Sequence, residues 1–167
     1  MLFIIIMKAA FPGSFDPPTL GHLNVIQRSA AIFDEICVII AENKLKNYFF
    51  STDERLDLVS TLVKPWNNVS VTLCRGLIVD FLKENDIKLL IRGIRERDFS
   101  YEFELSMVNK SLNSDIETVF LTTDPKYAFI RSSRIKEIGS FGGDISSMVS
   151  PEVERAINEK LKDNSFN

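Results

Sequence analysis

Short apolar runs rich in β-branched residues alternate with longer runs of helical spacing, and this alternation most constrains the fold. Strands are predicted at residues 3–11, 35–41, 69–73, 88–91 and 118–121. The run 36–40 is almost continuously apolar, which is typical of a strand covered on both faces. Strands that alternate with helices pair in parallel through right-handed crossovers. The sequence therefore predicts an α/β fold, doubly wound, with a five-stranded parallel sheet and helices on both faces.

Helices are predicted at residues 21–33, 52–63, 78–85, 99–112, 133–138 and 151–162. Ser51 and Glu54 have the spacing of a capping box at the start of the second of these helices. Thr19 is a candidate cap for the first helix. With 167 residues, the chain is expected to form a single domain over residues 1–162, followed by a loose tail at 163–167.

Composition and charge exclude several classes of function. The net charge is −3 and the basic residues form no extended stripe, so no binding to nucleic acid is expected. The apolar residues 1–6 are too short to span a bilayer and lack the pattern of a signal peptide, so no membrane association is expected, and Met7 remains an alternative start. Cys37 and Cys74 lie singly in apolar runs, which favours reduced thiols in a cytoplasmic protein.

The loop after the first predicted strand carries the only histidine of the chain, His22. Ligands of doubly wound folds bind beyond the carboxyl ends of the strands, where unpaired N–H groups of helix starts attract phosphate. Gly13 lets the backbone approach a ligand, and Ser14 offers a hydroxyl. An imidazole at this position is expected to donate to phosphate oxygens and to carry positive charge at modest pH. The alternative is a tight turn without a ligand.

Arginines gather after the fourth predicted strand, where Arg92, Arg95 and Arg97 surround Gly93. Guanidinium groups bind phosphate with two parallel hydrogen bonds, so this cluster is a candidate anion site. The alternative is a solvated loop whose arginines pair with Glu96 and Asp98.

Polar residues also follow two other strands. Ser132 and Ser133 begin a helix after the fifth strand and are joined by Arg134 and Lys136, although a plain N-cap would explain one serine. Lys44 and Lys46 follow the second strand and are either part of a lid or ordinary surface charges.

These clusters together resemble a known family. The run Thr19-Leu20-Gly21-His22 matches the Thr/His-x-Gly-His motif of the nucleotidyltransferase superfamily. The amino-acid sequence at residues 12–17, 92–95, 98–102 and 142–144 is similar to that of bacterial phosphopantetheine adenylyltransferases. The resemblance covers residues 7–161. It implies an enzyme of coenzyme A biosynthesis that joins ATP to 4′-phosphopantetheine and yields dephospho-coenzyme A and pyrophosphate. It further implies a homohexamer and Mg²⁺ that arrives with ATP, with no metal held by protein residues alone.

The resemblance also implies roles for individual residues. His22 would stabilise the transition state. The residues implied to bind phosphopantetheine are Ser14, Lys46, Ile78 and Arg92. The residues implied to bind ATP are Ser14, Phe15, His22, Gly93, Ile94, Arg95, Glu102, Tyr127, Ala128, Phe129, Ile130, Arg131, Ser132 and Ser133.

The chain departs from the family pattern at two places. The loop between Arg95 and Asp98 is one residue shorter than usual, and Arg131 replaces a small polar residue. Two alternatives stay open at this point. One is a nucleotidyltransferase with another phosphorylated acceptor, such as nicotinamide mononucleotide or glycerol phosphate, and the other is a noncatalytic nucleotide-binding regulator.

Overall fold

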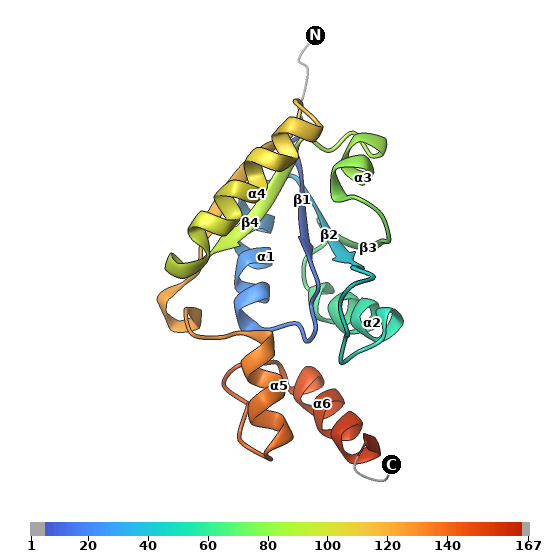
Figure 1. Cartoon of the computed structure of the whole chain (residues 1–167), viewed down its shortest axis with the longest axis vertical. Helices are drawn as coiled ribbons and strands as arrows, with labels where there is room; N and C mark the ends of the chain where they lie inside the picture. The colour runs from blue at the N-terminus through green and yellow to red at the C-terminus, as the bar shows by residue number, and fades with distance from the viewer. Residues whose placement is uncertain (1–5, 165–167) are drawn as a thin grey trace.

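The computed structural model, which describes residues 6–164, is built around one parallel sheet (Figure 1). Its strands are β1 (Lys8–Gly13), β2 (Glu35–Ala41), β3 (Val69–Cys74), β4 (Leu89–Ile94) and β5 (Glu117–Thr122). The strand order is β3-β2-β1-β4-β5, and every neighbouring pair is parallel. This confirms the doubly wound, five-stranded sheet that the alternating pattern predicts.

Helices cover both faces of the sheet. They are α1 (Leu20–Ile32), α2 (Thr52–Val63), α3 (Ile78–Glu84), α4 (Phe99–Leu112), α5 (Ser132–Ser140) and α6 (Pro151–Asn164), with short 3-10 turns at Glu96–Asp98 and Pro125–Tyr127. None of the helices within residues 6–164 is long and apolar enough to cross a membrane.

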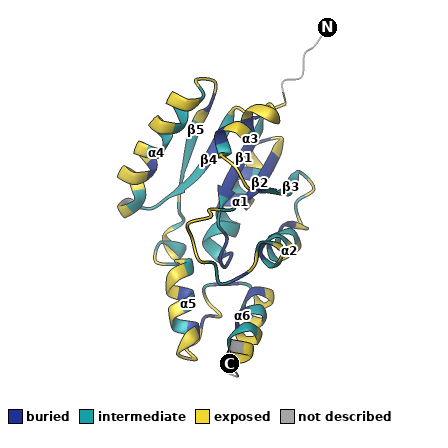
Figure 2. Cartoon of the chain, turned by 45° about the vertical axis from the view of Figure 1, so that its right-hand side comes forward, coloured by how far each residue is buried: buried dark blue, intermediate teal, exposed yellow. Residues whose placement is uncertain are grey.

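Alternate residues of the strands point to opposite faces of the sheet, so the core forms one apolar cluster on each face. Ala9 and Phe11 of β1 pack with α1 and α2 on one face, whereas Ala10 packs with α3 on the other. A third apolar cluster joins α5 and α6 to Phe50, beyond the carboxyl ends of the strands (Figures 1 and 2). Because the chain winds outward in both directions from β1, the carboxyl ends of β1 and β4 form a switch point, which is where ligands bind in such sheets.

The observed boundaries differ from the prediction mainly at the chain ends and at β4, which runs to Ile94, so that Arg92 and Gly93 lie on the strand and not after it. β1 starts at Lys8 and continues to Gly13, because β2 offers hydrogen-bonding partners up to Ile40. Residues 3–5 of the predicted first strand and residues 165–167 of the predicted tail lie outside the described residues. Residues 163 and 164 are helical, since α6 runs to Asn164.

Two predicted helix caps are present. Ser51 and Glu54 form the expected capping box, with the Glu54 carboxylate accepting from the Ser51 N–H at 2.6 Å. Thr19 caps α1, and the residue that completes its capping box is His22. The first turn of α1 therefore fixes the imidazole.

Candidate active site

Two adjoining cavities open at the carboxyl ends of the strands. The first, about 530 Å³, lies between the start of α1, the end of β4 and the start of α5, and we call it the α1/α5 cavity. The second, about 520 Å³, lies between the loop after β2, the start of α3 and one face of α4, and we call it the α3/α4 cavity. The residues lining both are Pro12, Gly13, Ser14 and Arg92.

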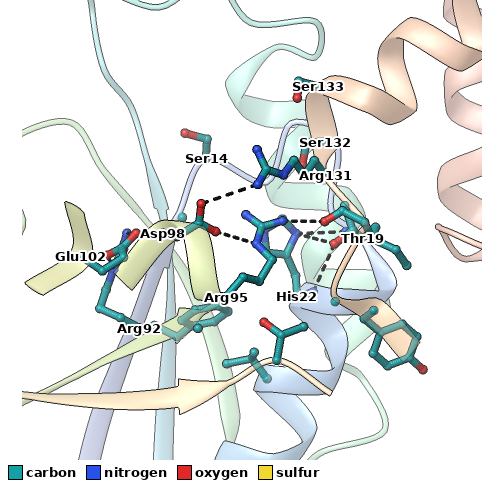
Figure 3. Close-up of a pocket in the computed structure, with 18 of the residues that line it drawn as sticks. Ser14, Thr19, His22, Arg92, Arg95, Asp98, Glu102, Arg131, Ser132 and Ser133 are labelled. Atoms are coloured by element: carbon teal, nitrogen blue, oxygen red, sulfur yellow. Dashed lines mark hydrogen bonds and ion pairs between the residues drawn. The ribbon is translucent and has the colours of Figure 1, made fainter. Parts of the chain in front are cut away.

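The imidazole of His22 is held in one orientation by the helix cap (Figure 3). The Thr19 backbone N–H donates to Nδ1 at 3.1 Å, while the His22 N–H donates to Thr19 Oγ1 at 3.2 Å. The Phe15 ring packs against the imidazole edge to face, with the centroids 5.0 Å apart. Because Nδ1 accepts a hydrogen bond, the single proton of the neutral ring lies on Nε2. The ring therefore has one donor available for a ligand.

His22 is neutral in the free protein near pH 7. Burial, together with the positive charges of Arg95 and Arg92, lowers the pKa of His22 to about 4, and burial is the largest of these causes. The expectation of a positively charged imidazole at modest pH is therefore wrong for the protein without ligand. Arg92 and Arg95 are two of the four arginines that line the α1/α5 cavity and make it positive, and His22 supplies a neutral N–H donor.

Arg92 is held in place by a buried carboxylate. Its Nε and Nη2 donate to the two carboxylate oxygens of Glu102 at 2.6 and 2.8 Å, and its Nη1 donates to the Pro12 carbonyl at 3.1 Å. This fork fixes the guanidinium plane at the boundary between the two cavities. Glu102 thus forms an ion pair with Arg92, which the spacing of the two residues in the sequence did not predict.

Asp98 joins two further arginines at the α1/α5 cavity. Its carboxylate accepts from Arg95 Nε at 2.6 Å and lies 3.9 Å from Arg131 Nη2 (Figure 3). Arg95 also donates to the Ile130 carbonyl at 2.7 Å, which ties the end of β4 to the start of α5. Arg131, the departure from the family pattern, therefore lines this cavity instead of pointing away from it.

The first loop is fastened to its neighbours by Asp16. The buried carboxylate accepts from the backbone N–H groups of Phe49 and Phe50 and from Lys136 Nζ, all within 2.9 Å. Ser132 Oγ donates to the Pro17 carbonyl at 2.8 Å. Lys136, one of the polar residues that the sequence groups after the fifth strand, is therefore the partner of Asp16.

The structure separates the predicted binding residues into the two cavities. All four residues expected to bind phosphopantetheine line the α3/α4 cavity: Ser14, Lys46, Ile78 and Arg92. Most of those expected to bind ATP line the α1/α5 cavity: Ser14, His22, Gly93, Arg95, Glu102, Tyr127, Ile130, Arg131, Ser132 and Ser133. Only Ser14 and Arg92 of the predicted residues line both cavities. The two sets of predicted residues thus line two cavities with a common wall.

Four predicted ATP-binding residues lie elsewhere. Ile94 and Ala128 line an adjoining cavity of about 500 Å³ that shares Arg95 with the α1/α5 cavity. The Phe15 side chain is buried beside His22, so only its backbone is placed to meet a ligand. The Phe129 side chain is 80% exposed and lines none of these cavities.

Carboxylates near the cavities are already engaged by cations. Asp98 and Glu102 are the acidic residues that line the α1/α5 cavity, and both accept from arginines. Within residues 6–164, no group of three His, Cys, Asp or Glu side chains forms a metal site.

Sequence reasoning missed Arg55, whose side chain is fully buried behind the wall of the α3/α4 cavity. The signal was present: Arg55 stands four residues before Val59 and eight before Val63, so it lies on the apolar stripe of α2. An arginine on such a stripe calls for a partner in the fold, and here the partners are backbone carbonyls.

The chain is similar in sequence to proteins of a known family. Residues 10–138 match the model of the cytidylyltransferase-like family. The chain is 47% identical to a phosphopantetheine adenylyltransferase of Thermotoga neapolitana over 94% of this chain and 98% of that protein. It is 48% identical to one of Dictyoglomus turgidum over 93% of this chain and 98% of that protein.

A solved structure shares the fold at low sequence identity. It is that of a Vibrio parahaemolyticus protein assigned as a nicotinate-nucleotide adenylyltransferase, with a TM-score of 0.72 and 21% identity over 94% of this chain and 95% of that one. That likeness shows the fold alone, whereas the identity to the two adenylyltransferases extends over nearly the full length of those proteins. On that full-length identity, the chain belongs to the phosphopantetheine adenylyltransferase family of cytidylyltransferase-like proteins.

Proposed function

We propose that this protein transfers the adenylyl group of ATP to 4′-phosphopantetheine, with dephospho-coenzyme A and pyrophosphate as products. The observation that carries the proposal is the pair of cavities that meet at Ser14 and Arg92. A phosphate oxygen of the acceptor attacks the α-phosphorus of ATP in line. The bond from that phosphorus to the bridging oxygen breaks, and pyrophosphate leaves with the bonding electrons.

The two substrates approach from opposite sides of the common wall. ATP occupies the α1/α5 cavity, with its phosphates near His22, Arg95 and the start of α5. Phosphopantetheine occupies the α3/α4 cavity, with its phosphate toward Arg92 and its arm along the apolar side chains Ile78, Leu105 and Leu112. The exposed Lys46 lies at this cavity and adds positive charge. Catalysis then consists mainly of holding two anions in line and offsetting their repulsion.

His22 contributes a donor that is already oriented. The Nε2–H group is fixed by the hydrogen bond that Nδ1 accepts from Thr19, so no reorganisation is needed as charge develops on the transferring phosphoryl group. Nδ1 is engaged by the Thr19 N–H, and Nε2 keeps its proton throughout the reaction. The ring therefore acts neither as a nucleophile nor as a base.

Mg²⁺ enters this proposal as part of the nucleotide substrate, MgATP. The carboxylates of the α1/α5 cavity are held by Arg92 and Arg95, so phosphate oxygens and water are the expected ligands of the ion. When bound, Mg²⁺ neutralises charge on the phosphates.

The protein is proposed to work as a homohexamer. Apolar side chains on α4 are about half exposed or more in the single chain, and these are Phe99, Tyr101, Phe103, Met107, Val108 and Leu112 (Figure 2). Exposed apolar side chains of this number on one helix support an interface. Light scattering on a size-exclusion column, with Met107→Glu as a disrupting variant, measures the assembly directly, and a monomeric wild type would contradict it.

A cytoplasmic location is proposed from the cysteines. Cys37 and Cys74 are both free and buried. Free thiols of this kind are typical of reducing compartments.

Pyrophosphate release with MgATP is the test of the function. We expect release with 4′-phosphopantetheine and none above background with nicotinamide mononucleotide; glycerol phosphate is assayed with both MgATP and MgCTP. Activity with one of the other acceptors alone would assign a different branch of the superfamily. ATP binding without turnover on any acceptor would favour the regulator.

A further inference from the structure

Arg55 carries a buried charge that none of the described carboxylates neutralises. Its side chain has no exposed surface, and none of the ion pairs within residues 6–164 includes it. Its Nε has no hydrogen-bond partner in that part of the chain. A buried charge without an opposite charge costs several kcal/mol unless other groups offset it. The position therefore calls for an explanation beyond packing.

The partners of Arg55 come from the carboxyl ends of two neighbouring strands, β1 and β2, and from the start of α2. Its Nη1 donates to the Ser14 carbonyl at 2.8 Å and to the Ala41 carbonyl at 3.3 Å, which joins the loop after β1 to the end of β2. Its guanidinium carbon lies 3.9 Å from the centroid of the Tyr48 ring, a cation–π arrangement. Nη2 donates to Thr52 Oγ1 at 3.2 Å.

Three of these partners form the wall of the proposed acceptor site. Ser14, Ala41 and Tyr48 all line the α3/α4 cavity, whereas Arg55 does not line it. Ser14 also lines the α1/α5 cavity. The guanidinium thus contacts the carbonyl of a residue that lines both cavities, while Arg55 itself lines neither of them.

We propose that Arg55 is a positioning residue for adenylyl transfer, which sets the backbone at Ser14 and directs an unneutralised positive charge at the meeting point of two anionic substrates. The inference rests on the proposed function. The planar guanidinium is suited to this task because one side chain bonds carbonyls from two segments while stacking on a ring. In a low-dielectric interior its charge acts on phosphates over a longer distance than an exposed charge would.

The test uses two variants. Arg55→Met removes both the charge and the planar guanidinium, whereas Arg55→Lys keeps a positive charge but lacks the guanidinium. Val59→Ala is the matched control, because Val59 lies one turn further along the same buried face of α2 and lines neither cavity. For each folded variant, kcat, both KM values, the ATP affinity by calorimetry and the melting temperature are measured.

We expect Arg55→Met to lower kcat by about 100-fold and Arg55→Lys by about 10-fold, as for other displacements near 1 Å in active sites. The ATP affinity and both KM values should worsen together, because Ser14 faces both substrates. Val59→Ala should lower the melting temperature and leave the kinetic constants within about threefold.

Folded Arg55→Met or Arg55→Lys with kinetic constants and ATP affinity close to those of the wild type would overturn the proposal. Failure of both variants to fold would also overturn it and would assign Arg55 to folding alone. The wild type is assayed first: if it releases no pyrophosphate with phosphopantetheine, the proposed function fails, while the calorimetric ATP affinities still test Arg55.

Discussion

Replacing His22 with asparagine separates the two tasks of its imidazole in this structure. Nδ1 accepts from the Thr19 N–H and completes the cap of α1, while Nε2–H remains for a phosphate. An asparagine oxygen can take the place of Nδ1, but asparagine has no donor at the position of Nε2. We therefore expect His22→Asn to keep the cap and to lose the transition-state donor.

The magnitudes follow from the two interactions. Loss of one preorganised donor lowers kcat by roughly 10²–10³, or about 3–4 kcal/mol of transition-state stabilisation. Loss of a cap interaction costs about 1 kcal/mol of folding free energy. His22→Ala should therefore show both losses, whereas His22→Asn should show the first alone. The assays are pyrophosphate release at saturating substrates and unfolding by urea.

The pH dependence of stability gives a second measurement on the same variants. The pKa of His22 is about 4 in the folded protein and near 6.5 in the unfolded chain, so the unfolded state binds more protons between these values. The free energy of unfolding of the wild type should therefore decrease, relative to that of His22→Asn, as the pH decreases from 6.5 to 4. The difference amounts to up to about 3 kcal/mol, less where water in the cavity screens the charges.

Two results would refute this reasoning. One is a kcat of His22→Asn within about threefold of the wild type, since the donor would then have no role in the transition state. The other is a stability difference between wild type and His22→Asn that stays constant from pH 7 to pH 4, since the imidazole would then not be neutral in the folded protein.

Three other substitutions test the surroundings of the site. Gly93→Ala would place a Cβ 2.9 Å from Val25 Cγ2 and should cost about 1–3 kcal/mol by thermal unfolding, with partial recovery in the double variant with Val25→Ala. Asp16→Asn should destabilise the protein by about 3 kcal/mol because Lys136 loses its charge partner, and an unchanged unfolding midpoint would contradict this. Arg92→Ala should chiefly raise the KM for phosphopantetheine, and steady-state kinetics that show an effect on ATP alone would reverse the assignment of the two cavities.

Local patterns along the chain were enough to predict the fold and the positions of the site residues in the sequence. Strand and helix periods are local, so the bounds of α2 and α4 agree with the prediction residue for residue. The rule that parallel strands end at one edge then brought the segments around Ser14, Arg92 and Ser132 together, although they are distant in sequence.

The pairing of the charged and polar groups at the site, in contrast, depends on the three-dimensional fold. Arg92 pairs with a carboxylate ten residues away, and Lys136 with one 120 residues away, so neither partner could be read from local spacing. Burial and neighbouring charge likewise set the neutral state of His22. These properties depend on distances through space and on exclusion of water, which the order of residues along the chain does not encode locally.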